Sequence, residues 1–378
     1  MKMTEQIKRL DFDYASFFEN LHQEPELSGQ EYLTGAKIRA VLEAYDVHVY
    51  DLDLETGLVA RIGLGGQPVL ALRCDIDALP VEESSGLAYA SQIPGRMHAC
   101  GHDFHTTTVL LTTLLLKSVE ASIQGTIKII FQPAEEINKG AESILATGIL
   151  DDVQSIFGIH CAPDLEVGQI GIIAGAVTAA VDRFAINILG RGAHAASPNL
   201  GSDPIVTAAQ LVSAAQSIVS RRVDPFHSAV LSFTHIDGGQ TWNVIPDRVF
   251  LEGTVRTHDA GDRAMIRNRL EAMTQAVAQA HDMEADFSWE PGPPATRNNE
   301  ALADLAARIA RDCLLDVVLP IPAMIGEDFA YYAERIPACF VMIGTGLSKP
   351  LHNPAIIIDQ AAIPTTATYL FELLKSLF

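Results

Sequence analysis

Short apolar runs alternate with helical patterns along the first 160 residues. The runs at 69–72, 125–131 and 155–159 are rich in aliphatic and β-branched residues, which predicts buried strands. Between them, residues 107–122 are apolar enough for a mostly buried helix. An earlier helix is predicted after residues 28–31, whose Ser-Gly-Gln-Glu order is typical of a capping box. Strands that alternate with helices predict an α/β sheet.

The pattern changes in the middle of the chain. A long strand is predicted over 176–190, and Asp203 with Pro204 supplies an N-cap and a first-turn proline for a helix that reaches about Arg222. Two strands, a second helix and a last strand follow, at 228–235, 248–256, 266–277 and 284–289. This β-α-β-β-α-β order is that of a ferredoxin-like α+β unit.

The α/β pattern resumes after the Pro- and Gly-rich segment 290–294. A helix is predicted around 302–315, a strand at 339–343 and a final helix near 365–377. We therefore expect an α/β fold in which residues 1–176 and 291–378 form one mixed-sheet domain. Residues 177–290 would be inserted into it as a ferredoxin-like domain.

Charge and composition narrow the classes of partner and compartment. Lys and Arg number 26 against 47 Asp and Glu, a formal charge of −21, so nucleic acid and membrane surfaces are poor partners. No run of 18 apolar residues occurs, and the first ten residues lack the apolar core of a secretory signal. The five cysteines show no C-x-x-C spacing, which favours a reducing compartment, and we expect a cytoplasmic protein.

The segment MHACGHDFH at 97–105 is the most distinctive motif. It places three histidines, a thiol and a carboxylate close together, and these side chains bind borderline-soft divalent metals. The alternative is a histidine-rich loop with satisfied hydrogen bonds. Not all five side chains can be ligands, so some would hydrogen-bond to the ligands or begin the helix that is expected to start at Asp103.

Further side chains of the metal-binding type follow the predicted strands. In open α/β sheets, ligand sites gather at the carboxyl ends of strands. Each of these residues would also fit a solvated loop or a satisfied core position when taken alone. Their shared placement at strand ends predicts a metal site, and the residues concerned are Asp75, Asp77, Glu135, Glu136, His160 and His352.

Eight motifs, in order along nearly the whole chain, resemble those of the co-catalytic metallopeptidase family of aminoacylases and glutamate carboxypeptidases. The similarity is strongest to its amidohydrolase branch, which contains hippurate hydrolases, N-acetyl-diaminopimelate deacetylases and auxin-conjugate hydrolases. The motifs are RCDIDALPVEE (73–83), MHACGHDFH (97–105), QPAEE (132–136), GIHCAPDLEVGQIG (158–171), GRGAHAASPNLGSDP (190–204), GGQTWNVIPDRVFLEGTVR (238–256), GEDF (326–329) and LHNP (351–354).

The resemblance implies a di-metal catalytic domain with an inserted lid or dimerisation domain. It implies two divalent ions per chain, of Zn, Mn, Ni or Co, with the Cys100 thiolate bridging them. Glu135 would be the general acid/base, and Asp77 would orient a metal ligand, as Asp103 would in a similar way. His194 would contact the oxyanion, Asn243 and Arg256 would contact the substrate, and His98 and His105 would be structural. The implied metal ligands are Cys100, His102, Glu136, His160 and His352.

The predicted activity is metal-dependent hydrolysis of the amide bond of N-acyl amino acids. A dipeptidase or carboxypeptidase that uses the same metal site is the alternative, and a non-catalytic metal-binding relative is a third hypothesis. A homodimer through the inserted domain is expected, and whether His194 acts within its own chain or across a dimer stays open. The sequence departs from the pattern of the branch at Pro337-Ala338 and at 355–360. The substrate of a relative therefore cannot be assigned to this protein from the resemblance.

Overall fold

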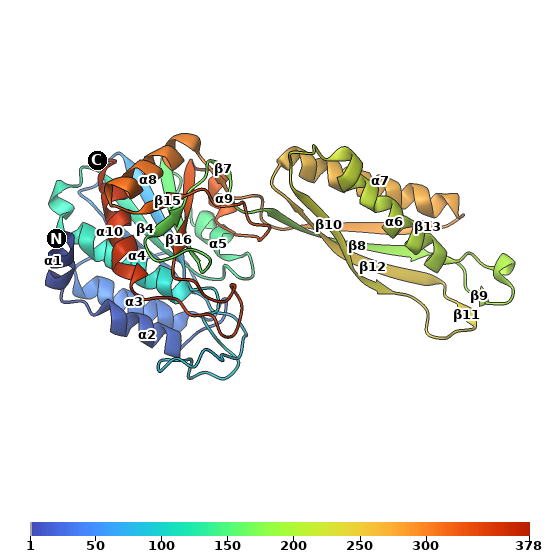
Figure 1. The fold of residues 1–378 in the computed structure, drawn as a ribbon, viewed down its shortest axis with the longest axis horizontal. Helices are drawn as coiled ribbons and strands as arrows, with labels where there is room; N and C mark the ends of the chain where they lie inside the picture. The colour runs from blue at the N-terminus through green and yellow to red at the C-terminus, as the bar shows by residue number, and fades with distance from the viewer. Residues whose placement is uncertain (1) are drawn as a thin grey trace. The chain divides into compact units, whose positions relative to one another are not determined.

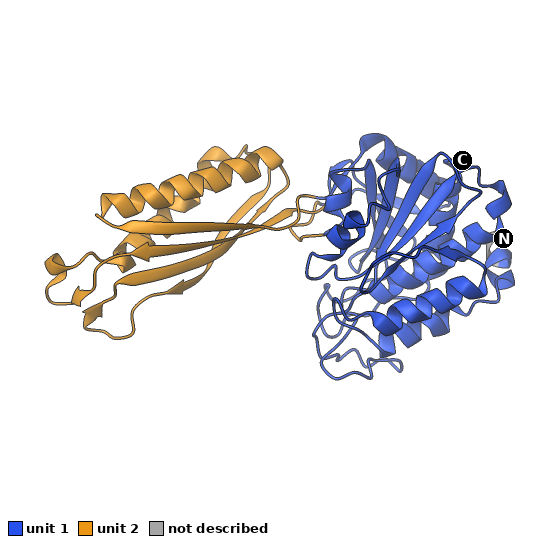
Figure 2. Ribbon diagram, turned by 180° about the vertical axis from the view of Figure 1, so that it is seen from behind, with its two compact units in different colours: residues 1–177, 296–321, 328–378 blue, residues 178–295, 322–327 orange. Residues whose placement is uncertain are grey.

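The computed structural model describes residues 2–378, which form two compact units (Figure 2). Unit 1 comprises residues up to 177, 296–321 and 328–378, and unit 2 comprises residues 178–295 and 322–327. Residues 291–295 and 322–327 belong to unit 2 because their backbone bonds to its first strand segment. The Gly292 amide donates to the Val181 carbonyl at 2.9 Å, and Ala179 donates to Ile325 at 3.0 Å.

Unit 1 is built on an eight-stranded mixed sheet. Strands β3, β4, β5 and β16 are parallel neighbours at its centre, while β2 pairs with β4 in the antiparallel sense. The carboxyl ends of the four parallel strands therefore share one edge of the sheet. The strand order is β1 (His48–Val49), β2 (Leu58–Ile62), β4 (Thr126–Gln132), β3 (Val69–Asp75), β5 (Ser155–Ala162), β16 (Ala338–Gly344), β6 (Gln169–Gly171) and β15 (Asp316–Val318).

Both faces of this sheet are buried. Leu70 and Leu72 pack into one apolar cluster and Val69 and Ala71 into another, which explains why this strand is continuously apolar rather than alternating. Helix α4 lies on the first face between α2 and α10 (Figure 1). The helices of unit 1 are α1 (Lys2–Arg9), α2 (Tyr14–Gln23), α3 (Tyr32–Ala44), α4 (His102–Ser118), α5 (Gly140–Ala146), α8 (Glu300–Asp312), α9 (Ala330–Ala333) and α10 (Ala362–Lys375).

Unit 2 has the expected β-α-β-β-α-β order. Its antiparallel sheet is ordered β10, β12, β8, β13, and helices α6 and α7 pack on one face (Figure 1). The Asp203 side chain caps α6 by accepting from the Ile205 amide at 2.9 Å, which confirms the predicted helix start. The elements are β8 (Ala180–Leu189), α6 (Pro204–Arg222), β10 (Ala229–Asp237), β12 (Arg248–Thr257), α7 (Ala260–Ala280) and β13 (Glu284–Pro291).

Two short strand pairs complete the fold. Strand β9 (Ala193–His194) pairs with β11 (Val244–Ile245) in unit 2, and β7 (Gly175–Ala176) pairs with β14 (Arg297–Asn298) in unit 1. The long strand predicted from residue 176 therefore begins only at Ala180, because Ala176 already belongs to the β7–β14 pair. Among residues 2–378, no helix has the length and apolar character that crossing a membrane requires.

Candidate metal centre

The metal-type side chains meet at the carboxyl edge of the central strands. His160 lies near the end of β5, Glu136 follows β4, and His352 lies in the loop after β16. Cys100 and His102 come from the start of α4, where Gly101 has a φ of +76°. A Cβ at Gly101 would approach the Cys161 sulfur to 2.6 Å, so only glycine fits between the thiol and the helix.

Two triads of ligand atoms share the Cys100 sulfur. One is Cys100, His102 and His160, the other is Cys100, Glu136 and His352, and the atoms of each lie within 4.8 Å of one another. The sulfur is 3.5 Å from Nε2 of His160 and 3.3 Å from Nε2 of His352. One thiol between two sets of nitrogen and carboxylate donors is the arrangement that a bridging ligand requires.

In His102 and His160, one ring nitrogen is hydrogen-bonded to the protein and the other faces the site. Nδ1 of His102 bonds Oδ1 of Asp77 at 3.2 Å, and Nδ1 of His160 donates to the Cys161 carbonyl at 2.8 Å. Asp77 also accepts from the Ser28 hydroxyl at 2.6 Å and from the Glu136 amide at 3.1 Å. Burial favours the protonated form of Asp77, but His102, Ser28 and the Glu136 amide together outweigh burial and hold its pKa below its usual value.

Unsatisfied atoms at this site fit a metal ion. Nε2 of His102 and Oε1 of Glu136 are buried and have no hydrogen-bond partner among the residues that the structure describes. Leaving buried polar atoms unsatisfied costs about 1–3 kcal/mol each. Thiolate, imidazole and carboxylate are the donors that Zn, Co, Ni and Mn accept. The residues present therefore fit two divalent cations.

The backbone directly before Glu135 and Glu136 is unusual. Ala134 has a φ of +52°, and Glu135, the residue after it, is 8% exposed. The Asp328 amide donates to Oε1 of Glu135 at 3.4 Å. The carboxylate of Glu135 and that of Glu136 lie close enough to share a cluster with His102. Neighbouring carboxylates thus face one site from a single kinked loop.

A buried ionic network lies under the site, and the sequence pattern did not predict it. Arg73 is fully buried and donates to Asp75 and Asp328 at 2.8 Å each, and to Gln132 at 2.8 Å. Asp75 in turn bonds Nδ1 of His105 at 2.5 Å. A lone arginine inside an apolar strand, and the GEDF motif that holds Asp328, were the available signals. The network ties the ends of β3 and β4 together directly beneath the metal-type residues.

The other two histidines of the 97–105 motif occupy closed surroundings. Nε2 of His105 accepts from the Cys161 amide at 2.8 Å, so its proton lies on Nδ1. Burial and neighbouring imidazoles lower the pKa of His105 to about 4 against the pull of Asp75, which keeps the ring neutral. His98 is 2% exposed, and its ring nitrogens have no hydrogen-bond partner among the described residues.

Asp103 is held by a histidine from α2. Nδ1 of His22 bonds Oδ2 of Asp103 at 2.6 Å, and Nε2 bonds Glu83 at 3.2 Å. Burial lowers the pKa of His22, but the two carboxylates outweigh burial and raise it to about 10. The expected contact of Asp103 with a metal ligand is replaced by this ion pair, which joins α2, the loop at Glu83 and the start of α4.

We expect His22→Gln to destabilise the fold by about 3–5 kcal/mol at pH 6, because it leaves two buried carboxylates without their cation. The pKa of His22 in the folded protein, about 10, exceeds the ordinary value of 6.5 for histidine. The native state thus holds a proton that the unfolded state releases, and stability is lost as the pH rises from 6.5 to about 10. Urea unfolding of both proteins should show their difference shrinking over this range, and a constant difference would contradict the assignment.

The structure places the predicted substrate residues of unit 2 in two groups. His194 pairs with Val244 across β9 and β11, and the Asn243 carbonyl accepts from the Ala195 amide at 3.0 Å, so these residues are neighbours. The Ala196 amide donates to Nδ1 of His194 at 3.1 Å, which leaves the proton of the neutral ring on Nε2. Arg256 lies near the other end of β12, opposite Val181 and Val230.

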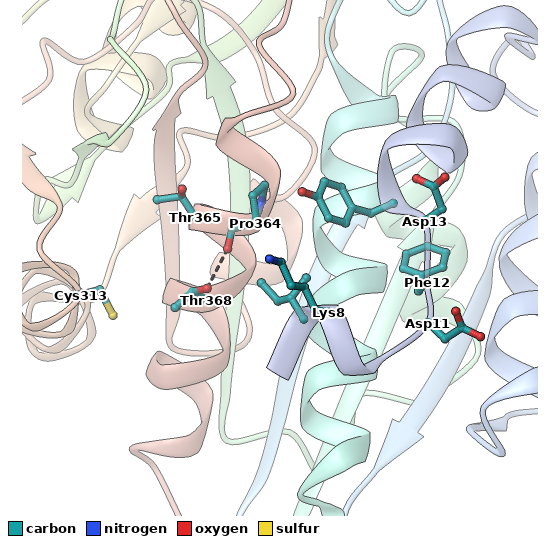
Figure 3. A pocket seen from close by; sticks show the side chains of 10 residues that line it. Lys8, Asp11, Phe12, Asp13, Cys313, Pro364, Thr365 and Thr368 are labelled. Carbon is teal, nitrogen blue, oxygen red and sulfur yellow. Dashed lines mark hydrogen bonds between the residues drawn. The ribbon is translucent and has the colours of Figure 1, made fainter. Parts of the chain in front are cut away.

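A cavity lies elsewhere in unit 1. It measures about 650 Å³ and lies between the segment at residues 7–14, Cys313 and helix α10 (Figure 3). Lys8, Asp11 and Asp13 give it charges of both signs. It shares no residue with either ligand triad, so its size is not evidence about the metal site.

Comparison with known proteins gives the family. Residues 71–376 match the family model of peptidase family M20/M25/M40, which is more than half of the chain. The chain belongs to this family. A solved M20 structure from Bacillus subtilis, described as a dinuclear metal-binding peptidase, superposes with a TM-score of 0.89 at 38% identity and covers 99% of both chains.

Two similar proteins are named as a deacetylase and as an amino acid hydrolase. The chain is 46% identical to an N-acetyl-L-cysteine deacetylase from Bacillus subtilis, over 95% of this chain and 86% of that protein. It is 35% identical to an IAA-amino acid hydrolase of Arabidopsis thaliana, over 93% of this chain and 84% of that protein. The M20 fold, the metal-dependent amidohydrolase class and the resemblance noted from the motifs are thereby confirmed.

Proposed function

We propose that the protein hydrolyses the amide bond of N-acyl amino acids, in the manner of a deacetylase or hippurate hydrolase. The observation that carries this proposal is the pair of ligand triads that share Cys100, with the Glu135 carboxylate beside them. The names of the relatives, an N-acetyl-L-cysteine deacetylase and an IAA-amino acid hydrolase, support the substrate class.

In this proposal Cys100, His102, Glu136, His160 and His352 hold two divalent ions. Bound ions supply a water of lowered pKa and an electrophile for the carbonyl oxygen. The carboxylate of Glu135 accepts the proton of the attacking water and delivers it to the nitrogen of the leaving amine. Asp77 keeps the proton of His102 on Nδ1 and so presents Nε2 to the ion.

Residues of unit 2 would complete the site. Nε2 of His194 carries the proton that a developing oxyanion needs, and Arg256 or Asn243 would bind the substrate carboxylate. A basic side chain in this role would let a protein of charge −21 bind an anionic substrate. Cysteine and histidine ligands suit Zn, Ni or Co, while the carboxylate suits Mn. A free thiol at this position is favoured in a reducing compartment, and we propose that the protein is cytoplasmic.

The proposed function is tested with a substrate panel. N-acetyl, N-benzoyl and indole-acetyl amino acids are compared with dipeptides, using metal-stripped protein reloaded with Zn, Mn, Co or Ni in turn. The proposal predicts the highest kcat/KM on an N-acyl amino acid with at least one of these metals. Preference for dipeptides would favour the peptidase alternative, and no turnover with any metal would favour a non-catalytic relative.

The geometry of unit 2 bears on how its residues reach a substrate. From Arg248 to Arg256 the strand β12 spans eight residue steps, roughly 27 Å, and His194 and Asn243 lie beyond its Arg248 end. An N-acyl amino acid is much shorter, so His194 and Arg256 of one chain cannot contact the same substrate molecule. With Arg256 as the carboxylate-binding residue, this separation supports a homodimer in which His194 of the partner subunit completes each site. Asn243 lies beside His194 and carries no such requirement.

Surface features of unit 2 are consistent with such a dimer. Strand β10 is an edge strand of nine residues, and apolar side chains are exposed on it and on the neighbouring elements. An unpaired edge of this length is a template for pairing with another chain. The exposed apolar residues include Ile205, Val206, Phe226, Val230, Ile236 and Trp242.

His194→Ala should lower kcat by about 10²–10³-fold with little change in KM, because an oxyanion donor acts mainly in the transition state. Metal content should not change. Glu271→Gln, at an exposed position of helix α7 outside the apolar surface named above, is the control and should keep kcat. Near-normal kcat in His194→Ala would refute the oxyanion role.

Mixing inactive chains tests whether His194 acts across a dimer. Glu135→Ala and His194→Ala chains, exchanged in one solution, should recover activity, because a mixed dimer holds one complete site. Exchange is verified with a size-tagged chain. If exchange occurs and no activity returns, His194 acts within its own chain and the dimeric arrangement proposed above is wrong.

A further inference from the structure

Residues 28–31, which match a capping box in sequence, do not form one in the structure. Helix α3 is capped by Glu26, whose carboxylate accepts from the Leu33 amide at 3.1 Å and from the Thr34 amide at 2.7 Å. Ser28 instead donates to Asp77. The remaining member of the motif, Glu31, is 0% exposed and faces the interior of unit 1.

The Glu31 carboxylate joins three segments that are distant in sequence. Oε1 accepts from the Gly29 amide at 2.9 Å and from the Ala134 amide at 2.8 Å, and Oε2 accepts from the Thr56 hydroxyl at 2.8 Å. Burying a carboxylate costs several kcal/mol, and all three of these donors are neutral. An apolar residue could fill the space, but it would leave the Ala134 amide unsatisfied.

Ala134 directly precedes Glu135 and Glu136, so its backbone conformation sets the direction of both side chains. Ala134 has a φ of +52°, a left-handed conformation that costs a non-glycine residue about 1–2 kcal/mol. The Ala134 carbonyl accepts from the Lys139 amide at 3.1 Å, so both ends of the peptide kink are bonded. Without the bond to Glu31, Ala134 would relax toward negative φ and rotate the following residues.

We propose that Glu31 is a positioning residue that holds Ala134 in its left-handed turn and thereby aims Glu135 and Glu136 at the metal centre. It touches neither the ions nor the substrate. The inference rests on the proposed function for the roles of Glu135 and Glu136. Its consequence for metal binding, however, is measurable without any substrate.

The test is metal affinity, measured by competition between metal-stripped protein and a chromophoric chelator for Co or Zn. Glu31→Ala should weaken the ion bound through Glu136 by about 10–100-fold, the loss typical when the support of a ligand is removed. Glu31→Gln keeps an acceptor oxygen for the Ala134 amide and should restore affinity. Glu26→Ala is the matched control: it removes a helix cap worth about 1 kcal/mol and should leave metal affinity unchanged.

A second substitution separates positioning from a general loss of stability. Glycine adopts positive φ without strain, so Ala134→Gly should recover part of the affinity lost in Glu31→Ala. If Glu31 only stabilises the fold, or has no role, the effects of Glu31→Ala and Ala134→Gly on metal affinity should combine additively, to within about twofold. If Glu31→Ala does not fold, Glu31→Asp, which withdraws the oxygens by one methylene, takes its place in the same comparison.

The outcomes are distinct from those that test the proposed function. Unchanged metal affinity in Glu31→Ala, or no recovery with Ala134→Gly, would overturn the positioning role even if the wild type hydrolyses N-acyl amino acids. Weakened affinity with recovery would support the role even if the wild type acts on another amide.

Discussion

Glu135→Gln is expected to lower kcat by about 10⁴-fold, at or beyond the upper end of the range for general acid–base catalysis. The amide keeps the shape of the side chain but can neither accept the proton of the water nor return one to the leaving amine. The substitution removes no member of the two triads that share Cys100. The measurement is kcat on the best substrate of the panel, with metal content determined on the same sample.

Glu136→Gln is the matched control, since it alters the adjacent carboxylate of the same loop. Glu136 belongs to the triad with Cys100 and His352, so its substitution should lower metal content, and extra metal should restore part of the activity. If Glu135→Gln lost metal and Glu136→Gln kept it, the roles of base and ligand would be exchanged.

Cys100→Ala should remove both ions and abolish turnover, because both triads lose their shared member. Burial, followed by the nearby carboxylates, raises the pKa of the Cys100 thiol well above its usual value. Metal binding must therefore displace the thiol proton, and apparent metal affinity should rise with pH. Elemental analysis after dialysis, with and without added metal, measures the loss.

Cys161→Ala provides the comparison for a buried cysteine in the same region. Its thiol donates to the Cys100 carbonyl at 3.1 Å, but it belongs to neither triad that contains Cys100. It should keep two ions and most of its activity. A Cys100→Ala protein that retained two tightly bound ions would show that the thiolate does not bridge.

The architecture was predictable where local pattern and topology agree. Buried strands such as β4 and β5 are continuous apolar runs, and Asp203-Pro204 marks the start of α6 without any tertiary information. Boundaries were less predictable where partners are distant. The apolar run alone places the start of helix α4 near residue 107, whereas the 97–105 motif places it at Asp103. The helix begins at His102, and its buried polar first turn is stabilised by contacts with β3 and α2.

The candidate site was predictable to the extent that it follows strand ends. The five metal-type side chains meet at one edge because their strands are parallel neighbours. The supporting residues were not predictable. Glu31 matched a local capping pattern, yet its partner Ala134 lies 103 residues away, and Arg73 depends on Asp328, 255 residues away. Local spacing carries no information on such contacts.

The central claim is that two ions in the Cys100-centred site hydrolyse N-acyl amino acids. The most direct measurement is a titration of metal-stripped protein with the activating metal, in which bound metal and the rate of N-acyl amino acid hydrolysis are recorded at each step. The account predicts that activity rises until two ions per chain are bound and then stays constant, in keeping with the dinuclear relative. Full activity with less than one bound ion per chain would contradict it.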